Sequence, residues 1–346
     1  MAGWEIFFPP GARVLALPSW RRPRLYLTAG RLSRSWEDSS FYPASRLPAR
    51  LYRLALRMRA AARLGEARRV RSNVWPFGEF AREVWPEARS VVVLVGTPGP
   101  AQKTTAQVRG KHGEVLGYLK YAEKEAARQR LRREHHMLLN LPAGAGPEAV
   151  KFGPLGDGEA LLATALSGRA LPAALPPAQG LAEFSMSLAA PGSMPLEAHP
   201  WVRRARDLGE ESGLLDRRLE VLAGRSWPVA VQHGDFAPWN LIRKPDGALG
   251  AIDWEYGTLE GFPYLDLAYY VLQTSALIYR RTPAEGARRA VDYLSRRLAL
   301  EDAEALALTR LAAFDAHQSS REDGQPDGNA LQMWRWAVWQ GEVNGA

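Results

Sequence analysis

The segment VQHGDFAPWN at residues 231–240, together with AIDWE at residues 251–255, decides how this sequence is interpreted. The two segments place three oxygen-bearing side chains at fixed intervals: Asp235, Asn240 five positions later, and Asp253 thirteen positions after that. Transfer of a phosphoryl group from a nucleotide requires a carboxylate that accepts the acceptor's proton and hard oxygen ligands that hold magnesium on the phosphates. These three side chains can supply both.

The spacing of these residues carries the specificity of the motif. In the kinase catalytic loop, His-x-Asp is followed by Asn five positions after the Asp, and a second metal-binding Asp begins the next short segment. Here a Pro-Asp-Gly turn at residues 245–247 separates two short, largely apolar runs, 240–243 and 249–254. This pattern predicts a hairpin, which would return the chain so that Asp253 lies beside Asn240.

The alternative is an ordinary turn whose polar side chains bond only to their own backbone, but four polar positions match at fixed spacing. At this point the sequence resembles the aminoglycoside phosphotransferase and choline kinase-like family, part of the protein kinase-like superfamily. Its loop reads His-Gly-Asp-x-x-x-x-Asn, and its metal-binding Asp lies in an Ile-Asp-Trp or Ile-Asp-Phe segment. The resemblance implies that Asp235 is the catalytic base and that Asn240 and Asp253 bind Mg²⁺. It also implies that His233, the other catalytic-loop candidate, shapes the loop by hydrogen bonding.

A lysine and a glutamate that precede the motif are candidate nucleotide-binding residues. Lys120 lies in an apolar run, residues 114–121, which alternates like a strand, and Glu134 shares the apolar stripe of a helix expected from about 123 to 139. A lysine in an apolar strand needs a charged partner, so we expect Lys120 to pair with Glu134, as the strand Lys and helix Glu do in kinases. The alternative is that Lys120 extends to solvent.

Two further nucleotide contacts are expected from position rather than from motifs. The connection at residues 96–103 contains Gly99 and could cover phosphates with backbone N–H groups, yet two prolines remove donors and its spacing is not Gly-x-Gly-x-x-Gly. Lys103 at its end either reaches a phosphate or is solvated. In the resembled family, backbone groups of the segment that connects the lobes bind adenine, which would place Ala165 at that contact.

The fold expected from these elements is α+β, a two-lobed protein kinase-like fold with a basic N-terminal extension. We expect the small lobe at residues 90–166 and a mainly helical large lobe with the catalytic loop at 167–346. Residues 1–89 form the extension, whose role stays open. In the large lobe, Asp266 lies in a segment that resembles the family's Asp-Leu-Ala helix start. We expect it to accept backbone N–H bonds from the catalytic loop.

The N-terminal extension carries the positive charge of the chain. Residues 1–89 contain 17 Arg, no Lys and 7 acidic residues, a net charge of +10, whereas the whole chain has +8. Either the arginines reflect genome composition, or they meet an anionic partner such as a lipid headgroup, a polysaccharide or a nucleic acid. A basic amphipathic helix is expected from about 49 to 70. Its apolar side contains Leu51, Leu54, Ala55 and Met58. Such a helix can lie on an anionic membrane, but we prefer the interpretation that it packs on its own domain.

Composition limits the remaining possibilities. A chain of 346 residues with 46% hydrophobic residues can bury a substantial core. Its apolar runs are too short to cross a bilayer, and its first residues lack the pattern of a secretory signal, so we expect a cytoplasmic location without a transmembrane segment. The absence of cysteine excludes disulfides, thiolate zinc sites and thiol catalysis.

The sequence therefore predicts a phosphotransferase with ATP and Mg²⁺ as cofactors, which moves the γ-phosphoryl group to a hydroxyl of a small molecule or glycan. Neither an aminoglycoside nor choline is favoured as the acceptor. One alternative is a catalytically silent nucleotide-binding scaffold, a pseudokinase. Another is a protein that binds an anionic polymer through its Arg-rich front, although specific nucleic-acid binding is not predicted.

Overall fold

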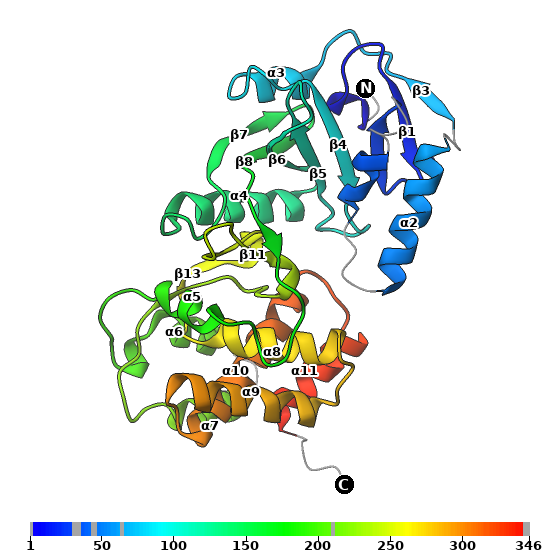
Figure 1. Cartoon of the computed structure of the whole chain (residues 1–346). Helices are drawn as coiled ribbons and strands as arrows, with labels where there is room; N and C mark the ends of the chain where they lie inside the picture. The colour runs from blue at the N-terminus through cyan, green and yellow to red at the C-terminus, as the bar shows by residue number, and fades with distance from the viewer. Residues whose placement is uncertain (1–2, 30–35, 43–46, 63–65, 209–211, 342–346) are drawn as a thin grey trace. The chain divides into compact units, whose positions relative to one another are not determined.

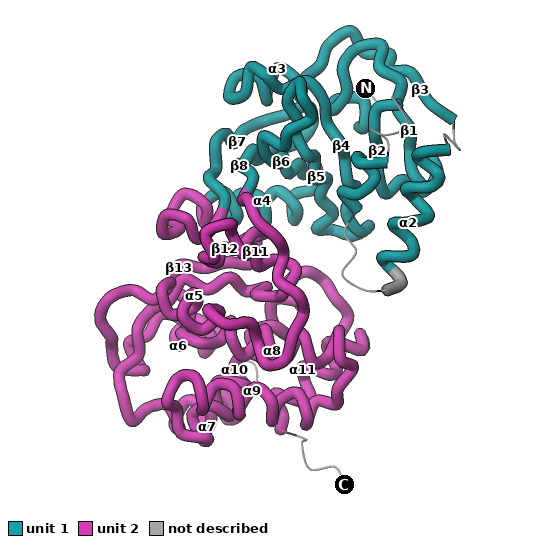
Figure 2. The backbone as a smooth tube through the Cα atoms, viewed as in Figure 1, with its two compact units in different colours: residues 1–135, 147–165 teal, residues 136–146, 166–346 magenta. Residues whose placement is uncertain are grey.

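The computed structural model describes residues 3–29, 36–42, 47–62, 66–208 and 212–341. The chain forms two compact units (Figure 2). Unit 1 comprises residues 1–135 and 147–165, and unit 2 comprises residues 136–146 and 166–346. In the part of the chain that is described, no helix has the length and apolar character needed to cross a membrane.

The described part of unit 1 is built on an antiparallel sheet with the strand order β3-β1-β2-β4-β5-β6-β8-β7 (Figure 1). Its strands are β1 (Arg13–Leu17), β2 (Leu25–Thr28), β3 (Ala67–Arg69), β4 (Ser90–Val95), β5 (Thr104–Arg109), β6 (Val115–Ala122), β7 (Ala149–Leu155) and β8 (Gly158–Thr164). Residues 1–89 supply the first three strands, and β2 pairs with β4. The expected extension and the expected small lobe therefore share one sheet.

The helices of unit 1 cover this sheet. They are η1 (Glu5–Phe7), η2 (Ser39–Phe41), α2 (Leu47–Ala61), α3 (Pro76–Arg82) and α4 (Glu125–Asn140), the last turn of which belongs to unit 2. Phe7 and Phe77 from the N-terminal region pack in one buried cluster with Leu119 and Leu162 of the sheet. Burying each such side chain contributes about 1.5–3 kcal/mol. The N-terminal region therefore belongs to the core of the unit rather than being appended to it.

Helix α2 differs from the expectation in its length and in the face that it buries. It ends at Ala61, and residues 67–69 form β3 instead of continuing the helix, because they pair with β1. Leu56 and Ala60 are buried against the sheet, whereas the predicted apolar side is exposed to solvent. The helix therefore packs on its own domain, as preferred, but through Leu56 and Ala60 and not through the predicted apolar side.

Unit 2 is mainly helical. Its helices are α5 (Leu181–Ser187), η3 (Leu196–Ala198), α6 (Pro200–Asp207), α7 (Ser212–Glu220), η4 (Pro238–Asn240), η5 (Trp254–Tyr256), α8 (Leu265–Leu277), α9 (Pro283–Leu298), α10 (Asp302–Glu322) and α11 (Ala330–Gln340). Its short strands are β9 (Arg169–Ala170), β10 (Ala230–Gln232), β11 (Leu241–Arg243), β12 (Leu249–Ala251) and β13 (Thr258–Gly261). Helix α8 is buried along most of its length and contacts α9 and α10, so it is the central support of this unit.

Candidate active site

The catalytic loop lies between β10 and the hairpin β11–β12 of unit 2. The hairpin predicted around residues 245–247 is confirmed, because Leu241 pairs with Ala251 in an antiparallel register. The backbone N–H of Ile252 donates a 2.8 Å hydrogen bond to the carbonyl of Asn240. The hairpin therefore returns the residue that precedes Asp253 directly to Asn240.

The side chains of Asp235 and Asn240 are joined within the loop. The Nδ2 of Asn240 donates to the backbone oxygen of Asp235 and to its Oδ2, both at 2.9 Å. Because these bonds use the amide nitrogen of Asn240, its Oδ1 is the group left to act as an acceptor or a metal ligand. The other carboxylate oxygen of Asp235, Oδ1, accepts a 2.7 Å hydrogen bond from the hydroxyl of Tyr269 on α8. Both oxygens of the candidate base are therefore held in place.

Asp253 adopts an unusual backbone conformation. Its φ of 69° and ψ of 56° lie in the left-handed region, which costs an L-residue other than glycine about 1–2 kcal/mol. Conformations of this kind are found at functional sites, where the surrounding structure holds them in place. The residue ends the hairpin and begins η5, so this conformation turns the chain sharply where the candidate metal ligand stands.

The pKa of Asp235 is raised to about 6, chiefly because the carboxyl group is buried, and the negative charge of Asp253 acts in the same direction. The hydrogen bonds from Tyr269 and Asn240 and the charge of Arg335 act in the opposite direction. A carboxylate with a pKa near neutrality can accept a proton and return it at physiological pH.

The donor set around Asp235 fits a magnesium ion. Two carboxylates repel each other there, and a divalent cation would offset their charge. No group of three or more His, Cys, Asp or Glu side chains in the described ranges is arranged to hold a metal. Magnesium typically uses one or two protein carboxylates and completes its shell with water and phosphate oxygens. Asn240 and Asp253 are the protein ligands that this pattern would use.

Asp266, at the start of α8, holds the beginning of the catalytic loop. As expected from the sequence, it accepts backbone hydrogen bonds from the loop: from His233 at 2.6 Å and from Gly234 at 3.1 Å. Burial raises the pKa of Asp266 to about 7. Gly234 has a φ of 77°, and a Cβ there would lie 2.5 Å from the backbone oxygen of Tyr256, so only glycine fits.

His233 is fully buried, and both of its ring nitrogens are engaged. Its Nε2 lies 2.9 Å from the carbonyl oxygen of Ile252, and its Nδ1 accepts a 3.2 Å hydrogen bond from the backbone N–H of Asp235. Since a carbonyl can only accept, the Nε2 carries the proton in this arrangement. The ring therefore links the loop to the hairpin, which fits the loop-shaping role expected for it.

The sequence did not predict two residues of the site, Tyr269 and Arg335. Tyr269 follows Asp266 by three positions on one helix, so the helical period could have placed the two side chains on one face. Arg335 on α11 lies 3.4 Å from the Tyr269 hydroxyl and also donates to Gln273, Ser320 and a backbone carbonyl. Its hydrogen-bond partners among the described residues are all neutral. No local sequence signal connects it with the motif.

In unit 1, Lys120 of β6 and Glu134 of α4 form the ion pair predicted from the sequence. The Nζ of Lys120 lies 2.5 Å from the Oε1 of Glu134, and Glu134 is buried. Strand β6 is hydrogen-bonded on both sides, to β5 and to β8, so the lysine stands on an inner strand of the sheet. Binding of a nucleotide by this pair stays a prediction.

The other two expected nucleotide contacts also lie in unit 1. The connection that contains Gly99 is closed at its base by a hydrogen bond from Gly96 N–H to the carbonyl of Lys103, and the Nζ of Lys124 donates to the carbonyl of Gly99 at 2.8 Å. Ala165 directly follows β8 and is partly exposed. Contacts of Gly99 with phosphates and of Ala165 with adenine stay predictions.

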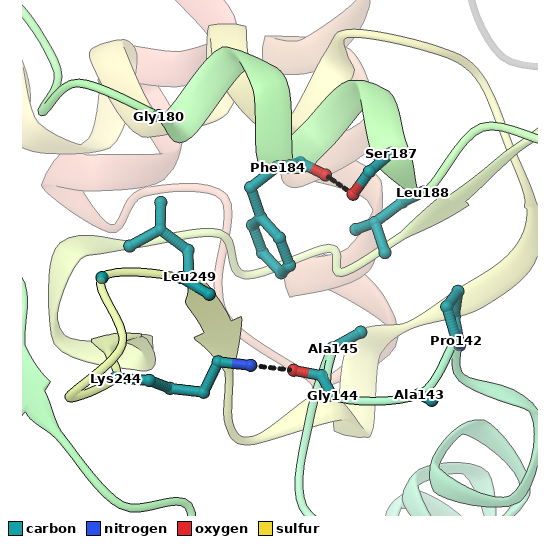
Figure 3. Close-up of a pocket in the computed structure, with 12 residues that line it drawn as sticks. Pro142, Ala143, Gly144, Ala145, Gly180, Phe184, Ser187, Leu188, Lys244 and Leu249 are labelled. Carbon is teal, nitrogen blue, oxygen red and sulfur yellow. Dashed lines mark hydrogen bonds between the residues drawn. The ribbon is translucent and has the colours of Figure 1, made fainter.

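A separate cavity of about 360 Å³ lies in unit 2 (Figure 3). Its walls include Phe184, Leu188 and Leu249, and the ammonium group of Lys244 donates to the carbonyl of Gly144 at 3.1 Å. None of the residues proposed for the active site lines this cavity.

The sequence matches the family described as APH, phosphotransferase enzyme family, over residues 103–308. One similar solved structure is that of the choline kinase LicA from Streptococcus pneumoniae, with 15% identity and a TM-score of 0.45, covering 69% of this chain and 89% of that chain. A Plasmodium vivax ethanolamine kinase has 12% identity and a TM-score of 0.45, covering 78% of this chain and 89% of that chain. The spectinomycin phosphotransferase APH(9)-Ia has 10% identity and a TM-score of 0.37, with 77% and 93% covered. A comparison with curated protein sequences finds no match.

The family match covers more than half of the chain and includes the catalytic loop, the hairpin and the ion pair of unit 1. The predicted α+β, protein kinase-like fold class is confirmed, because one unit carries an antiparallel sheet and the other is mainly helical. This protein therefore belongs to the APH phosphotransferase enzyme family.

Proposed function

We propose that this protein is a kinase that transfers the γ-phosphoryl group of ATP to a hydroxyl of a small molecule or glycan. Family membership supports the class of reaction. The observation that carries the proposal is the position of the Asp235 carboxylate. Asn240 of the loop and Tyr269 of α8 each donate a hydrogen bond to it, and the charge of Asp253 acts on it.

Asp235 is the proposed base. An ionised carboxylate has about four lone-pair positions, so the bonds from Asn240 and Tyr269 leave room for the hydroxyl of the acceptor. With its pKa raised to about 6, the group is mostly ionised at neutral pH and can accept the hydroxyl proton. Phosphoryl transfer depends mainly on positioning and electrostatics, which a carboxylate fixed at both oxygens provides.

Magnesium, when bound, neutralises charge on the phosphate oxygens, and Asn240 and Asp253 would hold it. Lys120, oriented by Glu134, would contact the α and β phosphates. Backbone groups near Gly99 and Ala165 would bind phosphate and adenine, respectively. These assignments follow from the family resemblance and from the ion pair of unit 1.

The acceptor is proposed only as a class. A glycan acceptor is the narrower proposal, and the support for it is the Arg-rich N-terminal region, which would suit an anionic polysaccharide. A cytoplasmic location fits the use of ATP.

The test is magnesium-dependent turnover of ATP against aminoglycosides, choline, hexoses, amino sugars and glycan fragments. Asp235→Ala is compared with Asp246→Ala, an exposed carboxylate in the nearby hairpin turn that serves as the matched control. We expect turnover with at least one acceptor, lost in Asp235→Ala and retained in Asp246→Ala. Binding of magnesium and ATP without any turnover would favour the pseudokinase, and failure to bind nucleotide would overturn the kinase proposal.

A further inference from the structure

Helix α2 of unit 1 presents an apolar stripe to solvent. Leu51, Leu54 and Met58 are 61%, 46% and 60% exposed. At 100° per residue these three positions fall within an arc of about 60° on the helix surface, so they form one continuous stripe. No other helix or strand in the described ranges carries more than one large apolar side chain that is exposed to this degree. Single exposed apolar residues are ordinary, but a stripe of three on one helix is a candidate contact surface.

The opposite face fixes the helix to the sheet of its own unit. Leu56 and Ala60 are 1% and 0% exposed and pack in a cluster with leucines of β1 and β2. The guanidinium of Arg57 stacks on Trp36 at 4.1 Å, and its Nε donates to the carbonyl of that residue. Figure 1 shows α2 beside β1 at the edge of the unit. The helix is therefore already packed on its own unit through the opposite face, and the stripe is not part of that contact.

Arginines border the stripe on both sides. On the helical wheel Arg50 lies at one border and Arg59 at the other, and both are exposed. Residues 47–61 contain four arginines and no acidic residue. Neither Arg50 nor Arg59 has an ion-pair partner in the part of the chain that the structure describes. The surface is therefore apolar along its centre and positively charged at its edges.

We propose that α2 binds the surface of an anionic phospholipid bilayer, with its axis in the plane of the membrane. In this arrangement Leu51, Leu54 and Met58 enter the boundary between headgroups and acyl chains. Arg50 and Arg59 lie at the level of the lipid phosphates, where each cation gains from the negative surface potential. The proposal concerns the location of the protein and does not depend on its catalytic activity.

Other occupants fit this surface less well. A nucleic acid offers phosphates to the arginines, but its backbone has no counterpart for the exposed leucines and methionine. A second copy of α2 would cover the stripe but would bring arginine borders of the same charge together. An anionic bilayer satisfies both the apolar centre and the charged edges.

The test uses the full chain in a flotation assay. Vesicles of phosphatidylcholine alone are compared with vesicles that also contain phosphatidylglycerol, each at low and high ionic strength. The test variant carries Leu51→Gln, Leu54→Gln and Met58→Gln, which keep helix-forming residues at exposed positions. The matched control carries the same change at three exposed apolar side chains on other helices, Leu139→Gln, Met186→Gln and Met333→Gln. Circular dichroism checks that both variants are folded.

We expect the wild type and the control to float with the anionic vesicles and not with phosphatidylcholine alone. The α2 variant should bind at least about tenfold more weakly, because it loses three apolar side chains that would be partly buried in the membrane. Arg50→Gln with Arg59→Gln should weaken binding and reduce its dependence on salt. Absence of wild-type binding, or full binding by the α2 variant, would overturn the proposal. So would a stripe-dependent dimer or binding to nucleic acid in place of vesicles.

Discussion

Removal of one hydroxyl, in Tyr269→Phe, tests whether α8 positions the proposed base. The hydroxyl donates a 2.7 Å hydrogen bond to Oδ1 of Asp235, and the ring is 8% exposed. Phenylalanine keeps the ring and its packing. Arg335 keeps its bonds to Gln273 and Ser320, so the helix contacts survive the change.

The magnitude follows from the kind of bond that is lost. A hydrogen bond to a charged group contributes about 1.5–3 kcal/mol, and each 1.36 kcal/mol corresponds to a factor of about ten in rate. Asp235 is partly exposed, so water can replace some of the lost interaction. We therefore expect kcat to fall by about 10- to 50-fold, while KM for ATP changes by less than about twofold. The unfolding free energy should fall by about 1 kcal/mol or less.

Steady-state kinetics with the best acceptor, together with urea unfolding, measures these quantities. Tyr270→Phe is the matched control. Tyr270 is the next residue on the same buried helix, and the side-chain hydrogen bonds to Asp235 come from Tyr269 and Asn240 instead. A Tyr269→Phe enzyme with full kcat would refute the reasoning, because Asn240 alone would then hold the carboxylate. An equal loss in Tyr270→Phe would trace the effect to the stability of α8.

Three further predictions concern stability and nucleotide use. Burial raises the pKa of Asp266 from 3.8 to about 7. The stability that this group contributes is therefore complete below pH 3.8 and is lost as the pH rises through 7. In Asp266→Asn, the unfolding free energy measured with urea should depend less on pH over this range. Lys120→Met should lower kcat/KM for ATP at least about tenfold and destabilise unit 1 by about 3 kcal/mol, since it leaves Glu134 buried without its ion-pair partner. Adding Glu134→Gln should restore the stability but not the turnover. Asp38→Ala should cost about 3 kcal/mol in urea unfolding, because Asp38 forms a buried 2.5 Å ion pair with Arg109.

Each of these predictions has a result that contradicts it. An unchanged pH profile in Asp266→Asn would mean that this carboxylate titrates as it does in the unfolded chain. If the double variant at Lys120 and Glu134 recovered turnover as well as stability, Lys120 would not be a nucleotide contact. Asp216→Ala, which breaks an exposed pair with Arg206, is the control for Asp38→Ala and should cost under about 1 kcal/mol.

Features set by short-range spacing could be predicted from the sequence. The hairpin that brings residue 252 to Asn240 follows from a Pro-Asp-Gly turn between two apolar runs. The Lys120–Glu134 pair follows from strand alternation combined with a helical stripe. In both cases the period of the backbone determines the direction of each side chain, so residue type and spacing are sufficient.

Helix α2 shows where the pattern alone was insufficient. The helix was expected to pack on its own domain, and its predicted apolar side carries Leu51, Leu54, Ala55 and Met58. The structure buries Leu56 and Ala60 instead, because a small residue such as Ala60 allows the helix to lie close to the sheet. Periodicity identifies apolar faces, but it cannot say which face meets the core.

One carboxylate behind the catalytic loop, Asp266, was expected from the sequence, whereas the second, Asp315, was not. Burial raises the pKa of both carboxylates, and in the described residues their hydrogen bonds come from neutral donors, although the charge of Arg204 lowers the pKa of Asp315. Asp315 accepts a 2.7 Å hydrogen bond from Gln232, the residue before His233, and Asp266 accepts the backbone of His233 itself. Burying a carboxylate reduces stability, so stability alone would not predict a second carboxylate, Asp315, behind this loop. Asp315 reaches Gln232 because α10 packs behind the loop, and residues 83 positions apart share no local pattern that could have predicted this contact.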